Sequence, residues 1–191
     1  MMRTKFIDII KRNSLAMAIK WAKLVAESQY TKTYQKLSEQ ERTRLAKDVY
    51  DNLGLWLDPK TTSAEIGRIY ANIGAARYQQ GYPLCELLYA FHYTKKVLLN
   101  HISSESLLPD TLRLYQTYNF IQEIYDFFDL AIFYEARGFQ EAVYKKVLAQ
   151  KGIDKKNIEE IFPKGSFYYE QTPDFRSFEK ALEGFNLFKV K

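Results

Sequence analysis

The sequence has a single cysteine, Cys85, and two histidines, His92 and His101, among 191 residues. One cysteine excludes an internal disulfide and a zinc site built from several cysteines. Neither histidine has a glutamate three positions before it, so the Glu-x-x-His pairs of di-iron bundles are absent. We therefore expect no metal site, and the sparse cysteine is typical of a reducing, cytoplasmic location.

Glycine and proline are scarce too, with 8 and 5 residues. An all-β chain of this length would need many more turn residues. No run of about 18 uncharged apolar residues occurs, so we expect no membrane-spanning helix and no membrane partner. The start of the chain is basic, but Asp8, Lys11 and Arg12 interrupt any apolar run, so we expect no signal peptide.

Sequence signs of catalysis are missing as well. The chain has no GxxxxGK[ST] motif and no GxGxxG that opens a helix, the usual phosphate-binding loops. A histidine-activated nucleophile needs both side chains within hydrogen-bond reach. Cys85 precedes His92 by seven residues on one predicted helix, nearly two turns along its axis. The sequence therefore predicts a protein that is not an enzyme.

Charge of one sign is not concentrated anywhere in the chain. The 28 basic and 23 acidic residues give a formal net charge of +5, and they are interspersed. A nucleic-acid surface needs its basic side chains gathered on one face. We therefore expect no nucleic-acid partner.

Apolar residues make up 47% of the chain and recur every three to four positions, the period of amphipathic helices. The pattern predicts an all-α fold, a single-domain bundle of about five main helices. These are expected near 4–28, 38–57, 62–80 and 83–103, with the fifth beginning at about 110. Ser38 and Glu41 match a capping box at the start of the second helix. Gly81 is a candidate C-cap for the third, with Pro83 opening the fourth.

The fifth predicted helix has the longest stripe, with apolar residues at alternating steps of four and three. Its members are Leu114, Tyr118, Ile121, Tyr125, Phe128 and Ile132. A stripe of this length is typical of a core helix or of a dimer seam. Gly138 either kinks or ends this helix, because glycine inside a helix costs about 1 kcal/mol.

The pattern changes after residue 152, which divides the chain into a helical domain, 1–152, and an extension, 153–191. The extension carries eight aromatic residues: Phe162, Phe167, Tyr168, Tyr169, Phe175, Phe178, Phe185 and Phe188. Burying each aromatic side chain is worth about 1.5–3 kcal/mol. We expect the extension either to pack across the bundle or to dock on a protein partner.

Four charged residues lie in or beside apolar stripes of the predicted helices: Arg77, Lys95, Asp126 and Asp129. Arg77 and Lys95 either extend from the edge of the bundle to solvent, or one of them pairs with Asp126 or Asp129 across the core. A buried pair would make Asp129→Ala cost about 3–5 kcal/mol.

Haem or another tetrapyrrole is an alternative, since one axial histidine in an aromatic pocket can hold haem iron. His92 and His101 are the candidates. Both lie at the margins of the fourth helix's apolar stripe, which favours a protein without a cofactor.

Together with Trp21, four stretches resemble a known family: YQKLS at 34–38, NLGLWL at 52–57, GAARYQQGYPLCEL at 74–87 and FFDLAIFYEARGF at 127–139. They are similar to the N-terminal domain of the RsbR/RsbRD group of bacterial stress-response co-antagonists, over about residues 5–144. Related domains precede bacterial sensor kinases. The resemblance implies a globin-like helical fold without haem, used as a signal-input module and usually homodimeric.

The expected function is therefore a non-enzymatic bacterial signal-input domain that acts through ligand or partner binding and dimer packing. A haem-type sensor and a scaffold docking through the aromatic extension are the alternatives. The candidate ligand pocket lies between the corner at 77–86 and the fifth helix. Its predicted lining is Trp21, Arg77, Tyr78, Tyr125, Phe128 and Tyr134.

Overall fold

The computed structural model describes residues 2–58, 60–105 and 111–150. Within these ranges the chain forms six helices and no strand, which confirms the predicted all-α fold. The helices are α1 (Met2–Glu27), α2 (Lys32–Gln35), α3 (Glu39–Trp56), α4 (Ser63–Gln79), α5 (Leu84–Glu105) and α6 (Thr111–Leu148). The five long helices are the five predicted ones. The extension at 153–191 lies outside the described residues, and the globin-like topology stays a prediction.

The helix ends follow from local side chains. Ser38 accepts a hydrogen bond from the Glu41 backbone N–H at 3.2 Å, and the Glu41 carboxylate accepts one from the Ser38 N–H at 2.8 Å. This confirms the capping box that starts α3. Gly81 has a φ of +81° just after α4, a conformation that glycine adopts without strain. The chain turns there toward α5.

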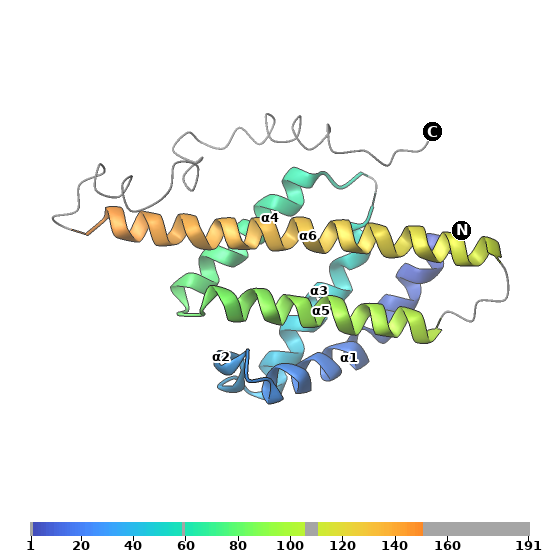
Figure 1. Cartoon of the computed structure of the whole chain (residues 1–191), viewed down its shortest axis with the longest axis horizontal. Coiled ribbons are helices and arrows are strands. Elements are labelled where there is room, and N and C mark those ends of the chain that lie inside the picture. Colours follow the sequence, from blue (N-terminus) through green and yellow to red (C-terminus); the bar gives the residue numbers. More distant parts are fainter. Residues whose placement is uncertain (1, 59, 106–110, 151–191) are drawn as a thin grey trace.

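The helices pack mainly in two pairs, α1 with α3 and α4 with α6 (Figure 1). Helix α5 lies against α1 and α6 and joins the two pairs. The α4–α6 contact is backbone on backbone. A Cβ added at Gly74 would lie 1.9 Å from the carbonyl oxygen of Glu135, and one at Gly138 would lie 1.8 Å from that of Ala71. Only glycine fits at these two positions.

Helix α6 runs through Gly138, so of the two alternatives for this glycine, the one in which it ends the helix is wrong. The buried face of α6 also differs from the predicted stripe. Phe128 is fully buried as expected, but Tyr118 and Tyr125 are 58% and 39% exposed. The helix instead buries Ile124 and Phe127 on the face that meets α4 and α5. Both faces of α6 are rich in apolar residues, so periodicity alone could not distinguish them.

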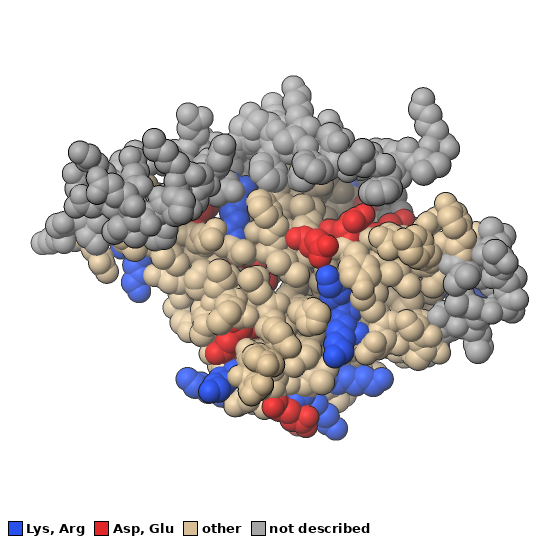
Figure 2. All heavy atoms as spheres, in the orientation of Figure 1, with Lys and Arg blue, Asp and Glu red and all other residues tan. Residues whose placement is uncertain are grey.

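The surface carries charge of both signs. Figure 2 shows one face on which Lys and Arg side chains and Asp and Glu side chains lie among many uncharged ones. Among the described residues, no helix combines the length and the apolar character that crossing a bilayer requires.

Candidate functional site

A cavity of about 340 Å³ lies inside the bundle, and all six helices contribute to its wall. Its volume falls at the lower end of small-molecule pockets, which span about 300–1,000 Å³. Five aromatic side chains line it: Trp21, Tyr34, Trp56, Tyr70 and Phe91. The polar lining residues are Asp48, Asn52, Arg77, Thr94 and Glu135.

Hydrogen bonds to the backbone of α5 hold this wall in place. The Trp21 indole N–H donates to the carbonyl oxygen of Ala90 at 2.8 Å, and the Tyr50 hydroxyl donates to that of Thr94 at 3.0 Å. All four residues are buried. Because a buried indole or phenol needs a polar partner, these two bonds fix α1 and α3 against α5.

The rings also contact one another. Trp56 meets Tyr70 edge-on at 5.3 Å between ring centroids, and Trp21 meets Tyr34 edge-on at 5.7 Å. Such pairs are worth about 0.5–1.5 kcal/mol beyond their buried area. The aromatic wall is therefore held by its own packing.

Glu135 on α6 is the most unusual residue of the cavity. Its side chain lines the cavity, is only 2% exposed, and its Oε2 atom has no hydrogen-bond partner in the described part of the chain. Burial raises the pKa of Glu135 to about 8, and the nearby Arg77 guanidinium opposes this shift. At neutral pH the carboxyl group is therefore mostly protonated.

Two residues of α4 face the same region. Tyr70 is 1% exposed, and its hydroxyl also lacks a hydrogen-bond partner among the residues described. Burial, with a smaller contribution from Glu135, raises the pKa of Tyr70 well above its usual value. Arg77 is half-buried, donates from Nη1 to Gln80 Oε1 at 2.8 Å, and lies 5.0 Å over the Tyr82 ring.

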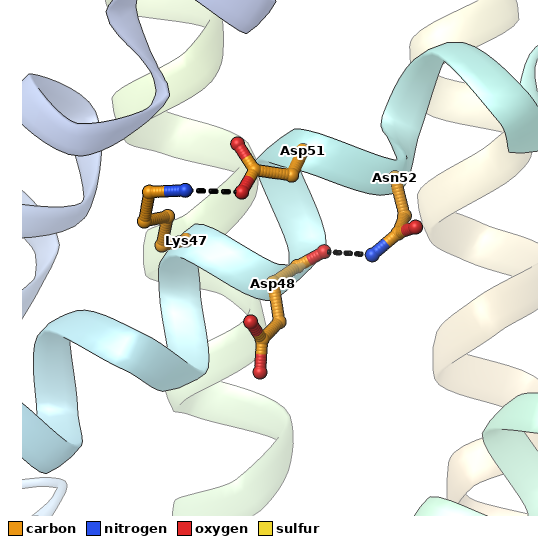
Figure 3. A network of polar contacts seen from close by, with 4 residues as sticks. All are labelled: Lys47, Asp48, Asp51 and Asn52. Carbon is orange, nitrogen blue, oxygen red and sulfur yellow. Dashed lines mark hydrogen bonds and ion pairs between the residues drawn. The ribbon is translucent and has the colours of Figure 1, made fainter.

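The α3 wall of the cavity is mostly apolar, but it has an exposed polar edge formed by two residues. Figure 3 shows that Lys47 pairs with Asp51 on one side of the helix, whereas Asp48 and Asn52 lie on another. The Asn52 amide donates to the backbone oxygen of Asp48 at 2.7 Å. Asp48 and Asn52 are exposed and line the cavity. The cavity thus runs from an exposed polar edge at α3 to buried polar groups on α4 and α6.

The structure brings only part of the predicted pocket together. Trp21 and Arg77 line the cavity. Phe128 and Tyr134 are buried in the core, with the Tyr134 ring packed on Gly67, and are not among the lining residues. A ligand-binding role for this predicted set stays a prediction.

The other two predicted pocket residues lie elsewhere. Tyr78 lines a hollow of about 570 Å³ between α4 and α6, whose other side chains are exposed or half-buried. Tyr125 lies at the surface, with the Lys95 ammonium 4.8 Å above its ring. The hollow at Tyr78 is the larger space, but the smaller cavity is the one that contains buried polar atoms without partners.

Glu135 is the residue that sequence reasoning missed. It follows Phe128 by seven positions and Ala131 by four, so it continues the buried face of α6. A carboxylate at such a position was the available signal. It was overlooked because the predicted stripe was ended at Ile132, although its next step of three positions reaches Glu135.

The Lys95–Asp129 pair does form. Lys95 Nζ lies 3.0 Å from Asp129 Oδ1 and joins α5 to α6. The two side chains are 14% and 66% exposed, so the pair lies at the edge of the bundle. Asp126 is exposed nearby, and desolvation followed by the charge of Asp129 raises its pKa. Arg77 lies at the cavity and contacts Gln80.

This position changes the expected cost of Asp129→Ala. Because Asp129 is mostly in water, we expect a loss of about 1 kcal/mol or less, in place of the 3–5 kcal/mol of a buried pair. Urea unfolding of the variant measures this, with Asp126→Ala as the neighbouring control. A loss above about 3 kcal/mol would show that the pair is desolvated in solution.

The two histidines do not reach the cavity. His92 is exposed and His101 half-buried on α5, and neither is a lining residue. A haem in this cavity would therefore find no histidine ligand among the residues described. Within the same ranges, no group of three or more His, Cys, Asp or Glu side chains is placed to hold a metal ion.

Comparison with known families gives one match. The family described as the RsbT co-antagonist protein RsbRD N-terminal domain matches over residues 16–145. No curated protein and no solved structure matches the chain. The matched range includes every residue that lines the cavity.

Proposed function

The chain belongs to the RsbRD N-terminal domain family of stress-signalling regulatory domains, and we propose that it senses a small molecule held in the cavity between its helices. In this proposal the domain binds and releases its ligand without chemical change. It acts in the bacterial cytoplasm as a signal-input module.

One observation carries the proposal. Tyr70 Oη and Glu135 Oε2 are both buried at one cavity and have no partner in the described chain. An unpaired buried polar group costs about 1–3 kcal/mol, and native proteins keep few of them. A bound molecule with matching polar atoms would recover this free energy.

The ligand can influence the bundle because the cavity touches all six helices of the described residues. Glu135 is also the residue whose carbonyl group contacts Gly74, at the close crossing of α4 and α6. A ligand shifts a conformational equilibrium only if it binds the two states with different affinity. A molecule between Tyr70 and Glu135 meets this condition if the spacing of α4 and α6 differs between the states.

We propose that ligand binding is signalled onward by a change in the packing between two copies of the chain, as the family resemblance implies. The exposed face of α6 supports this proposal. Tyr115, Tyr118 and Phe133 are large apolar side chains exposed on that helix. Large apolar side chains exposed on one helix are candidates for such a contact.

A thermal-shift screen of small molecules on the full chain tests the sensor proposal. A ligand at about 100 times its Kd should stabilise the protein by about 2.7 kcal/mol and raise Tm by about 5–10 °C. Ala46 is buried and lines the cavity, so Ala46→Leu should partly fill the cavity and abolish the shift. Ala76→Leu adds the same atoms at an exposed site and should keep it.

A ligand that stabilises the Ala46→Leu and Ala76→Leu variants by the same amount binds outside the cavity, and the proposal would then fail. Circular dichroism of both variants confirms that each one folds before the comparison is made.

A further inference from the structure

We infer that the ligand of this cavity is a small organic acid with an aromatic or branched apolar body, whose carboxylate binds among Tyr70, Arg77 and Glu135. The inference rests on the proposed function and adds the chemical class of the ligand. It follows from the hydrogen-bond donors at the buried end of the cavity, the charge there and the shape of the wall.

The buried end offers donors that have no acceptor. The Tyr70 hydroxyl is unpaired, and the Glu135 carboxyl can donate when it holds its proton. Arg77 has five N–H donors, and its hydrogen bond to Gln80 uses only one nitrogen. A carboxylate supplies two acceptor oxygens, and arginine binds carboxylates with charge-assisted, often bidentate hydrogen bonds.

The charge at this end also favours an anion. The titratable groups that face Glu135 are Arg77 and Tyr70 from α4 and Tyr34 from α2, with Asp48 at the exposed α3 edge. The pKa of Glu135 lies near 8 because of burial, so at pH 7 Arg77 carries the remaining charge. An anion is attracted to that charge and leaves the Glu135 proton in place.

An organic cation would meet the opposite conditions. At the buried end it would lie beside the Arg77 guanidinium, away from Asp48 at the exposed edge, and it would have to displace the proton of Glu135 to gain a counter-charge there. Removing that proton at pH 7, one unit below a pKa of about 8, lowers the affinity about tenfold. The aromatic wall by itself would accept either ligand, so the polar end decides between them.

The wall and the volume limit the body of the ligand. Trp21, Trp56 and Phe91 line the cavity with aromatic surface, against which an aromatic or branched apolar group packs well. A cavity of about 340 Å³ admits a small molecule of this kind. These residues lie on α1, α3 and α5, so the body would contact the helices that the carboxylate does not reach.

Isothermal titration calorimetry on the full chain with three probes tests the inference. 3-Phenylpropionate, 3-phenylpropanamide and 3-phenylpropylamine share one body and differ in charge. At pH 7 we expect the acid to bind at least tenfold more tightly than the amine, and more tightly than the amide. Equal binding of acid and amide, or tighter binding of the amine, would overturn the acid assignment and leave the sensor proposal standing.

If none of the three probes binds, the inference also fails, while the thermal-shift screen with Ala46→Leu still decides the proposed function.

Variants of the donor residues test each hydrogen-bond donor separately. Arg77→Met should weaken binding of 3-phenylpropionate about tenfold or more and leave that of the amide unchanged. Loss of both by the same factor would assign Arg77 a structural role only.

Glu135→Gln provides the sharpest variant, because the amide keeps a donor without a titrating proton. The wild-type affinity for 3-phenylpropionate should fall about tenfold per pH unit above pH 8, since binding needs the protonated carboxyl. The variant should bind within about threefold of the wild type at pH 7 and show no such fall up to pH 9. A fall of the same size in the variant would contradict the inference.

Discussion

Replacing Glu135 with glutamine is expected to remove most of the pH dependence of stability of the free protein between pH 5 and pH 8. The pKa of Glu135 is raised from 4.5 to about 8 by burial in the folded state. Below pH 4.5 both states hold the proton, and the contribution to stability is complete. As the pH rises, the unfolded chain releases the proton while the folded protein keeps it, so stability falls.

The size of this loss is about 1.4 kcal/mol per pH unit, and it continues until the folded protein ionises near pH 8. Over the whole interval this amounts to a loss on the order of 5 kcal/mol, a large fraction of the stability of an ordinary domain. Urea unfolding at pH 5, 6, 7 and 8, followed by tryptophan fluorescence, measures the slope for both proteins.

An exposed glutamate serves as the control. Glu39→Gln changes a side chain in water at the start of α3 and should leave the wild-type slope unchanged. Parallel profiles for the wild type and Glu135→Gln would show that Glu135 is solvated or paired in solution. The cavity would then lack its buried acid.

Alanine at Gly138 is expected to lower the free energy of unfolding by about 3 kcal/mol, although alanine favours a helix over glycine by about 1 kcal/mol. The new Cβ would lie 1.8 Å from the backbone oxygen of Ala71, and neither backbone can turn away as a side chain can. The two helices would have to separate. Chemical denaturation of Gly138→Ala measures the loss.

Gly74→Ala makes the same test from the other helix, where the new Cβ would lie 1.9 Å from the carbonyl oxygen of Glu135. Because the clash would push Glu135 away from Tyr70, we expect weaker binding of 3-phenylpropionate as well. Ala76→Gly on the exposed side of α4 calibrates helix propensity, at about 1 kcal/mol of destabilisation. If either Gly138→Ala or Gly74→Ala had the same free energy of unfolding as the wild type, the close backbone contact between α4 and α6 would be contradicted.

The sequence was sufficient for the features that depend on neighbouring residues. The five long helices, the Ser38 capping box and the turn at Gly81 were all predicted correctly, because periodicity and capping are local. Helix α2 lies between the first two predicted helices and was not itself predicted, since four residues are too few to show a helical period.

The features that depend on tertiary contacts were predicted less well. Which face of α6 is buried follows from the glycine crossing with α4, and no local pattern encodes it. For the same reason Tyr125 was included in the predicted pocket, whereas Glu135 was missed because the predicted stripe was ended at Ile132, one step before it. Lys95 with Asp129 was one of the pairings proposed from the stripes, but whether such a pair is buried depends on where the edge of the bundle lies.

A crystal structure of the full chain grown with 3-phenylpropionate would show whether the cavity binds an organic acid. We expect the phenyl ring between Trp21 and Trp56, and a carboxylate oxygen within hydrogen-bond distance of the Tyr70 hydroxyl and the Glu135 carboxyl group. A cavity that holds only ordered water, with the probe bound elsewhere or absent, would contradict this expectation.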